Sequence, residues 1–263
     1  MQSSLRKSAS FAKNGETKMK AEEGMTIQSI KELLLIARHA VFFGGAGVST
    51  ASGIPDFRGN GGLYAGDGRS NEYYLSRTCL RREPEKFFDY FRKNMDFSKV
   101  QPNDAHYALA ELEERGILRS VITQNIDGLH QRAGSKRVIE LHGSAERFYC
   151  SRCGKIYSSD VLSASTDIPR CTECGAVIRP DVTLYGEALD AYSFADAETE
   201  IAKADLLIVG GTSLVVHPAA SLVELFEGKH MIIINYSPTP YDRWAEYVIR
   251  DSIVEVLPAL AKE

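Results

Sequence analysis

A strand that runs into a glycine turn most constrains the fold of this chain. The apolar residues 40–43 (AVFF) are followed by GAGVSTASGIPDFRG, from Gly45 to Gly59. A strand, a glycine turn and a helix start together indicate a dinucleotide pyrophosphate site, because glycines let the backbone approach a phosphate closely. The fingerprint is incomplete, since Thr50 stands where a third glycine is expected and no acidic residue follows a second strand. A tight turn that binds nothing therefore remains an alternative at this point.

Apolar runs and helical patterns alternate along the rest of the chain. Helices are expected at residues 25–40, 84–95, 103–115 and 218–227. Buried strands are expected at residues 120–123, 138–141, 206–209, 231–234 and 247–249. Strands that alternate with helices predict an α/β fold, with a parallel sheet that carries helices on both faces.

Composition bounds the class of protein. A chain of 263 residues, 44% hydrophobic and 25% charged, fits one large globular domain with room for a small insert. Its net charge of −4 argues against direct nucleic-acid binding, and no apolar run is long enough for a membrane span. Residues 1–24 are polar, so we expect a disordered extension, with a transit-like segment as the alternative. Without a secretory signal, a reducing cytoplasmic location is expected.

Four cysteines have the spacing of a zinc site. Cys150-x-x-Cys153 and Cys171-x-x-Cys174 are separated by seventeen residues. Two such turns direct four thiolates toward one point, which predicts a structural zinc ion with no open position for catalysis. A redox pair is the alternative, but the insert at about 149–181 reads as strand-poor and fits thioredoxin-like chemistry badly. The fifth cysteine, Cys79, is expected to be packed in the core.

Polar residues follow several of the expected strands. They are Thr123 to Asp127 (TQNID), His142, Gly211 to Ser213, and Asn235. The carboxyl ends of parallel strands share one edge of the sheet, so these residues together predict a pocket, although each alone fits an ordinary turn. His142 is the best candidate for catalysis, because it directly follows a strand and a neutral imidazole can take up a proton. The other five histidines are expected to be caps or surface residues: His39, His106, His130, His217 and His230.

With these motifs the chain resembles the sirtuins, NAD-dependent protein deacylases, and it is most similar to bacterial members. The matching segments are GAGVSTASGIPDFRG, TQNID, ELHG (Glu140–Gly143), the four cysteines, GTSLVV (Gly211–Val216) and Asn235. They occur in the family's order from Met25 onward. The resemblance implies a catalytic domain over residues 25–263, built as a Rossmann-like sheet with a small zinc-binding domain at about 149–181.

The resemblance also implies that NAD is a co-substrate and that zinc is structural. The residues at the pyrophosphate would be Gly45, Ala46, Gly47 and Thr50, and those bordering the reacting ribose would be Asp56, Phe57 and Arg58. The ribose and nicotinamide pocket would contain Gln124, Asn125, Ile126, Asp127 and His142. The adenosine half would lie against Gly211, Thr212, Ser213, Asn235, Tyr236, Asp251 and Ser252.

The implied reaction is deacetylation of lysine in a protein or peptide, with His142 as general base and Asn125 as the second catalytic residue. Thr183, Tyr185 and Gly186 would contact the acyl-lysine substrate. The products would be free lysine, nicotinamide and O-acyl-ADP-ribose. Phe88 and Phe91 stand where the branch that prefers acidic acyl groups carries Tyr and Arg, so an apolar acyl group, acetyl first, is expected. Two alternatives remain: an NAD-dependent protein ADP-ribosyltransferase and a non-catalytic NAD sensor.

Overall fold

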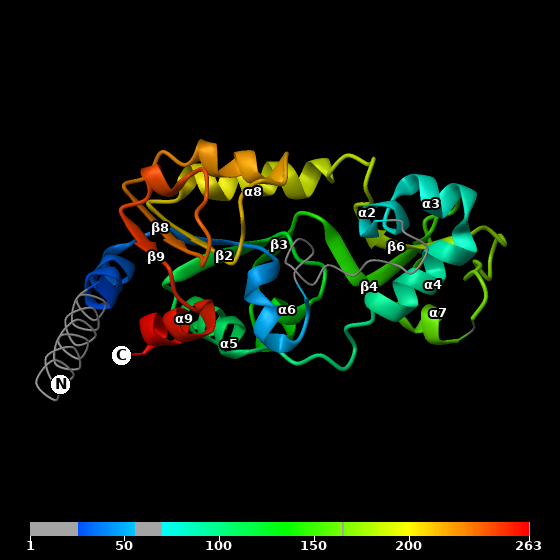
Figure 1. The fold of residues 1–263 in the computed structure, drawn as a ribbon, viewed down its shortest axis with the longest axis horizontal. Coiled ribbons are helices and arrows are strands. Elements are labelled where there is room, and N and C mark those ends of the chain that lie inside the picture. The colour runs from blue at the N-terminus through cyan, green and yellow to red at the C-terminus, as the bar shows by residue number, and fades with distance from the viewer. Residues whose placement is uncertain (1–25, 56–69, 165, 263) are drawn as a thin grey trace, which may run out of the picture.

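The computed structural model describes residues 26–55, 70–164 and 166–262 (Figure 1). The predicted disordered extension at residues 1–24 lies outside this part of the chain. So do Asp56, Phe57 and Arg58, three of the predicted cofactor residues.

A six-stranded parallel sheet forms the larger of two lobes. Its strands are β1 (Ala40–Gly44), β2 (Leu118–Thr123), β3 (Val138–Glu140), β7 (Leu206–Gly210), β8 (His230–Ile234) and β9 (Tyr247–Ile249). Their order is β3-β2-β1-β7-β8-β9, and every neighbouring pair is parallel. The order reverses beside β1, which is where open α/β sheets bind their ligands.

Helices cover both faces of this sheet, which confirms the predicted fold class (Figure 1). A helix over residues 26–36 packs on one face with α5 (Asp104–Glu114) and α9 (Ile253–Ala261). The other face carries α8 (Ala191–Lys203) and the 3₁₀ helix η3 (Ala219–Leu225). Side chains alternate along a strand, so β1 sends Phe42 into the first core and Phe43 into the second. Burial of each such side chain contributes about 1.5–3 kcal/mol.

The helix predicted at 218–227 is present but is a 3₁₀ helix, over Ala219–Leu225, rather than an α-helix. The backbone nitrogen and the hydroxyl of Ser221 both donate to the Pro218 carbonyl, at 3.1 and 2.7 Å. A serine that bonds back to the preceding turn competes with the regular α-helical pattern.

The smaller lobe is built on a three-stranded antiparallel sheet. Its strands are β4 (Gly143–Cys150), β5 (Ile156–Ser158) and β6 (Ile178–Val182), in the order β5-β4-β6. The expectation of a strand-poor insert is therefore wrong. β6 alternates apolar buried residues with the charged Arg179 and Asp181, and β5 buries no residue fully, so neither strand shows a continuous apolar run.

Among the described residues, the helices of the smaller lobe are α2 (Asn71–Tyr74), α3 (Arg77–Arg82), α4 (Pro84–Asn94) and α7 (Asp160–Ser163). Phe91 of α4 and Phe148 of β4 are both fully buried, with ring centroids 5.9 Å apart and edge to face. This contact joins the helices to the sheet that carries the cysteines.

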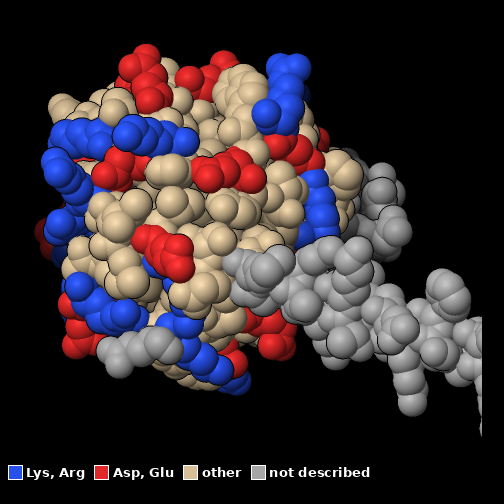
Figure 2. All heavy atoms as spheres, turned by 90° about the vertical axis from the view of Figure 1, so that its left-hand side faces the viewer, with Lys and Arg blue, Asp and Glu red and all other residues tan. Residues whose placement is uncertain are grey.

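Charges of both signs lie close together at the end of the molecule where β8 and β9 are found (Figure 2). Arg250, which follows β9, pairs with Asp242 in η4 (Asp242–Trp244). Within the described residues, no helix has the length and apolar character needed to cross a membrane.

Candidate active site

The loops that follow β1 and β7 touch at the reversal point of the sheet. The nitrogen of Gly47 donates to the carbonyl oxygen of Gly211 at 2.8 Å. A Cβ atom at Gly47 would lie 2.8 Å from both Cα and O of Gly211, and one at Gly45 would lie 2.9 Å from Cβ of Thr212. These glycines are therefore required by contact between two loops. The loop after β1 then forms two short 3₁₀ turns, η1 (Ala46–Val48) and η2 (Thr50–Ser52).

A buried polar network links this loop to the residues that follow β2. The Ser49 hydroxyl donates to Oδ2 of Asp127 at 2.7 Å. Nδ2 of Asn125 donates to Ser49 Oγ and to the Gly45 carbonyl, both at 3.1 Å. Each amide proton of Asn125 thus has an acceptor, and its Oδ1 accepts no donor from the described residues. The network fixes Oδ1 as an acceptor for a ligand.

Asp127 and His106 are the ionisable groups of this network. Burial raises the pKa of Asp127, and the opposing contributions come from Leu129 N at 2.9 Å, Ser49 and the charge of Arg132. Burial, together with the charge of Arg132, lowers the pKa of His106 to about 4, so its ring is neutral at physiological pH. His106 Nε2 lies 3.4 Å from Ser49 Oγ.

His142 lies where β3 leads into β4, between the two lobes. Its Nδ1 is 2.7 Å from the carbonyl oxygen of Gln124. Because a carbonyl only accepts, Nδ1 carries the proton and Nε2 keeps its lone pair. Burial lowers the pKa of His142, against the hydrogen bond to Gln124, so the ring is neutral near pH 7. Gln124 also donates to Oγ1 of Thr212 at 3.1 Å, which ties the ends of β2 and β7 together.

The predicted adenosine residues fall into two groups on the same sheet edge. Gly211, Thr212 and Ser213 follow β7 at its centre, and the other four follow β8 and β9 at its far end: Asn235, Tyr236, Asp251 and Ser252. Asn235 follows β8, four strands from β3 in the sheet, which is about 19 Å at the usual strand spacing. Nδ2 of Asn235 donates to the Ser237 carbonyl at 2.8 Å, and Ser252 N donates to Asp251 Oδ1 at 2.6 Å. Ser213 and Tyr236 are exposed. The residues after β8 and β9 thus lie at the end of the edge opposite His142, with the β7 loop between them, an arrangement that suits an extended dinucleotide.

Two of the predicted substrate residues are tied to their neighbours by backbone hydrogen bonds. Thr183 N donates to the His142 carbonyl at 3.0 Å. Tyr185 N donates to Leu75 O and Tyr185 O accepts from Arg77 N, both at 3.0 Å. Gly186, the third, has a positive φ of 85° in the turn that follows.

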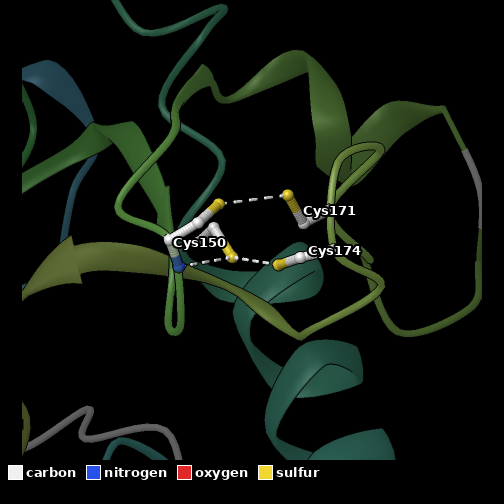
Figure 3. A group of neighbouring side chains, drawn as sticks. Cys150, Cys171 and Cys174 are labelled. Carbon is white, nitrogen blue, oxygen red and sulfur yellow. Dashed lines mark hydrogen bonds between the residues drawn. The ribbon is translucent and has the colours of Figure 1, made fainter.

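The four predicted zinc ligands form one cluster (Figure 3). Their sulfur atoms all lie within 4.8 Å of one another, with 3.4 Å between Cys150 and Cys174 and 3.6 Å between Cys153 and Cys171. These distances are far too long for disulfides and suit thiolates about 2.3 Å from a shared tetrahedral zinc ion. The Tyr157 hydroxyl donates to Cys171 Sγ at 3.2 Å, a bond that stabilises the thiolate form of Cys171. The cluster therefore fits structural zinc.

Comparison with known proteins places the chain. The sequence model of the Sir2 family matches residues 45–218, which is more than half of the chain. The chain belongs to the Sir2 family. The NAD-dependent protein deacetylase of Clostridium acetobutylicum is 49% identical over 235 residues, which cover 88% of this chain and 96% of that protein.

Solved Sir2 structures agree with this family assignment. Sir2 with a p53 peptide and NAD+ gives a TM-score of 0.79 at 40% identity, covering 88% of this chain and 95% of that one. A Sir2 variant with deacetylated p53 peptide and 3'-O-acetyl-ADP-ribose gives 0.81 at 39% identity, covering 89% and 96%. The predicted sirtuin resemblance is confirmed.

The Sir2-family chain also has features that its sequence did not reveal. Ser49 and His106 were not among the predicted site residues, yet both are fully buried and contact the network around Asp127. His106 is a cap, as predicted, since its Nδ1 accepts from Asn103 N at 3.2 Å at the start of α5.

The prediction that His130 is a cap or surface residue is wrong. Its ring is buried 4.8 Å from that of His106, and neither ring nitrogen has a partner among the described residues. Burial is the main reason that its pKa falls to about 3, so it is neutral. Cys79 is fully buried, as predicted, and Phe88 and Phe91 lie in the same core.

Proposed function

We propose that this Sir2-family protein is an NAD-dependent protein lysine deacetylase. It transfers the acyl group of a lysine side chain to ADP-ribose and releases nicotinamide, O-acyl-ADP-ribose and free lysine. The relative from Clostridium acetobutylicum carries the same activity in its name, and the similar Sir2 structures hold NAD+, p53 peptides and an acetylated ADP-ribose. Acyl-lysine proteins or peptides are accordingly the expected partners.

The observation that carries the proposal is the fixed tautomer of His142. Its Nδ1 donates to the Gln124 carbonyl, and its lowered pKa keeps the ring neutral, so Nε2 can take up a proton at physiological pH. NAD supplies the ribose that accepts the acyl group, and nicotinamide is its leaving group. His142 is then the general base that takes a proton from a ribose hydroxyl.

Asn125 is the second residue with a chemical role in this proposal. Its amide protons are held by Gly45 and Ser49, so Oδ1 presents a preset acceptor toward the sheet edge. A preset acceptor costs no reorganisation when a hydroxyl or a developing positive charge is bound. The loops at Gly45 to Thr50 and Gly211 to Ser213 would hold the phosphates and the adenosine half.

The four thiolates would hold zinc and shape the smaller lobe, with no part in the chemistry. We also propose a cytoplasmic location, because a reducing compartment keeps these cysteines as thiols.

The test is mass spectrometry of an acetyl-lysine peptide incubated with the protein and NAD. We expect nicotinamide, deacetylated peptide and O-acetyl-ADP-ribose in equal amounts. Attachment of ADP-ribose to protein would indicate the transferase alternative, and NAD binding without nicotinamide release would indicate a sensor. His142→Ala should bind NAD and lose turnover; full turnover in this variant would remove His142 from the mechanism.

A further inference from the structure

The segment that joins β6 to α8 carries the three predicted substrate residues and spans the two lobes (Figure 1). An ion pair lies at its base. Arg179 Nη1 donates to Glu187 Oε1 at 2.6 Å, and Arg179 Nη2 donates to Glu187 Oε2 at 2.8 Å. Two parallel hydrogen bonds of this kind fix both side chains in direction as well as distance. The pair is also largely buried, with 14% of Arg179 and 19% of Glu187 exposed.

The ion pair also fixes the turn from Leu184 to Glu187. Glu187 Oε2 accepts from Leu184 N at 3.0 Å, and Glu187 N donates to Leu184 O at 2.9 Å. Arg179 Nη2 donates in addition to the Val182 carbonyl at 3.0 Å. One guanidinium and one carboxylate therefore bond to the backbone on both sides of Thr183.

This turn determines the direction of the predicted substrate residues. Leu184 is buried in the core of the smaller lobe, whereas 43% of Tyr185 is exposed. Gly186 has the left-handed conformation that glycine adopts without strain. If the turn relaxed, Tyr185 and Gly186 would shift together, while the Gly45 and Gln124 loops would keep their own hydrogen bonds.

Packing does not support the turn from every side. A cleft of about 910 Å³ lies against it, and its lining includes Thr183, Gly186, Arg179 and Glu187 together with parts of β3 and α8. The buried ion pair therefore supplies support that side-chain packing would otherwise give.

We propose that Arg179 and Glu187 are positioning residues for the acyl-lysine substrate, which set the turn from Leu184 to Glu187 and thereby the affinity for the peptide. This inference rests on the proposed deacetylase function and on the substrate role of Tyr185 and Gly186. Neither side chain bonds to a predicted cofactor residue, so NAD binding is expected to be independent of the pair.

The test compares Glu187→Ala and Arg179→Lys with Asp181→Asn as a matched control. Lysine keeps the charge at 179 but cannot make the two parallel bonds. Asp181 lies on β6 two residues from Arg179, is 45% exposed, and pairs with Arg147 at 3.0 Å instead of with the turn. Steady-state kinetics with an acetyl-lysine peptide and NAD gives both KM values and kcat. Isothermal titration gives the NAD Kd of each variant.

The KM for peptide should rise about tenfold or more in Glu187→Ala and about threefold in Arg179→Lys. The KM for NAD, the NAD Kd and kcat at saturating peptide should stay within about threefold of the parent values. Asp181→Asn should match the parent protein. If Glu187→Ala fails to fold, Arg179→Lys carries the same test.

An unchanged peptide KM in Arg179→Lys would overturn the inference. So would a parallel change in kcat and both KM values, because that pattern indicates general damage to the fold. A parent protein that deacetylates no acetyl-lysine peptide would refute the proposed function instead, so the two failures are distinguishable.

Discussion

Ser49→Ala removes the hydroxyl at the centre of the buried network. The change deletes the 2.7 Å donor to Asp127 Oδ2 and one of the two acceptors of Asn125 Nδ2. Asn125 keeps its bond to the Gly45 carbonyl, and Asp127 keeps Leu129 N on its other oxygen. Oδ2 of Asp127 loses that donor in a residue that is only 4% exposed.

The cost follows from these contacts. A hydrogen bond to a charged group contributes about 1.5–3 kcal/mol, and the neutral bond from Asn125 contributes about 0.5–1.5 kcal/mol. The free energy of unfolding should therefore fall by about 2–4 kcal/mol. For a chain of this size, the loss corresponds to a decrease in Tm of about 4–16 °C.

The cost depends on pH through Asp127. The pKa of Asp127 in the folded protein is raised above the ordinary value of 3.8. Between pH 3.8 and the folded pKa, the folded state therefore binds a proton that the unfolded state has lost. Stability from this group is therefore lost as pH rises through that window. Removing the Ser49 donor raises the folded pKa further, because that bond favours the carboxylate. The stability deficit of Ser49→Ala should therefore be smallest at low pH, where Asp127 is protonated in both proteins, and should grow as pH rises through the folded pKa of Asp127.

Thermal unfolding followed by circular dichroism over a series of pH values from acidic to neutral measures this deficit. Ser52→Ala is the control, since Ser52 lies on the same loop and only accepts from Asn103 Nδ2, which also bonds to the Val48 carbonyl. It should lower Tm by less than about 4 °C. A deficit for Ser49→Ala that stays the same across the whole pH series would refute coupling between Ser49 and the Asp127 carboxylate. A deficit no larger than that of Ser52→Ala would refute the network.

Three further changes test other parts of the molecule. If His142 is the neutral base, as proposed, with its pKa lowered by burial, kcat/KM should be flat above the ordinary value of 6.5 and decline only at lower pH; a decline that begins between pH 8 and 7 would contradict this. Cys171→Ser should reduce bound zinc, measured by elemental analysis, and lower Tm, whereas full zinc retention would exclude the four-thiolate site. Phe148→Ala should cost about 3–5 kcal/mol in urea unfolding. Ile156→Ala, at a side chain that is 69% exposed, should cost less than about 0.5 kcal/mol, and equal costs would contradict the packing.

The larger lobe could be predicted from the sequence because its central strands, β1, β2, β7 and β8, are almost entirely buried. A parallel strand between two helical layers reads as a continuous apolar run, and all six such runs form strands of the sheet. The smaller lobe lacks this signal. In β6 the apolar residues alternate with Arg179 and Asp181, and Ile156 of β5 is exposed, so only the cysteine spacing indicated a module there.

The part of the site that could be predicted is the part that follows the strands, because the carboxyl ends of parallel strands lie at one edge of the sheet. That rule brought Gln124 and Thr212 together, and they form a hydrogen bond across 88 positions of sequence. Ser49 and His106 escaped prediction because nothing in their local sequence shows that they are buried. Their contacts join segments 57 and 78 positions apart, and only the tertiary structure reveals such pairs.

The loop after β1 requires glycine at position 47 but not at position 50, which explains why the third glycine of the fingerprint is missing. Gly47→Ala tests the first half of this statement. Gly47 is confined by the backbone of Gly211, and a backbone atom cannot rotate away from a new methyl group as a side chain can. Thr50 is exposed and only bonds back to Gly47 O at 3.1 Å, so a side chain is tolerated there. Gly47→Ala should separate the β1 and β7 loops, break the 2.8 Å bond to Gly211, and weaken NAD binding about tenfold or more by isothermal titration. Equal NAD affinity in Gly47→Ala and the parent protein would show that contact between these loops does not shape the cofactor site.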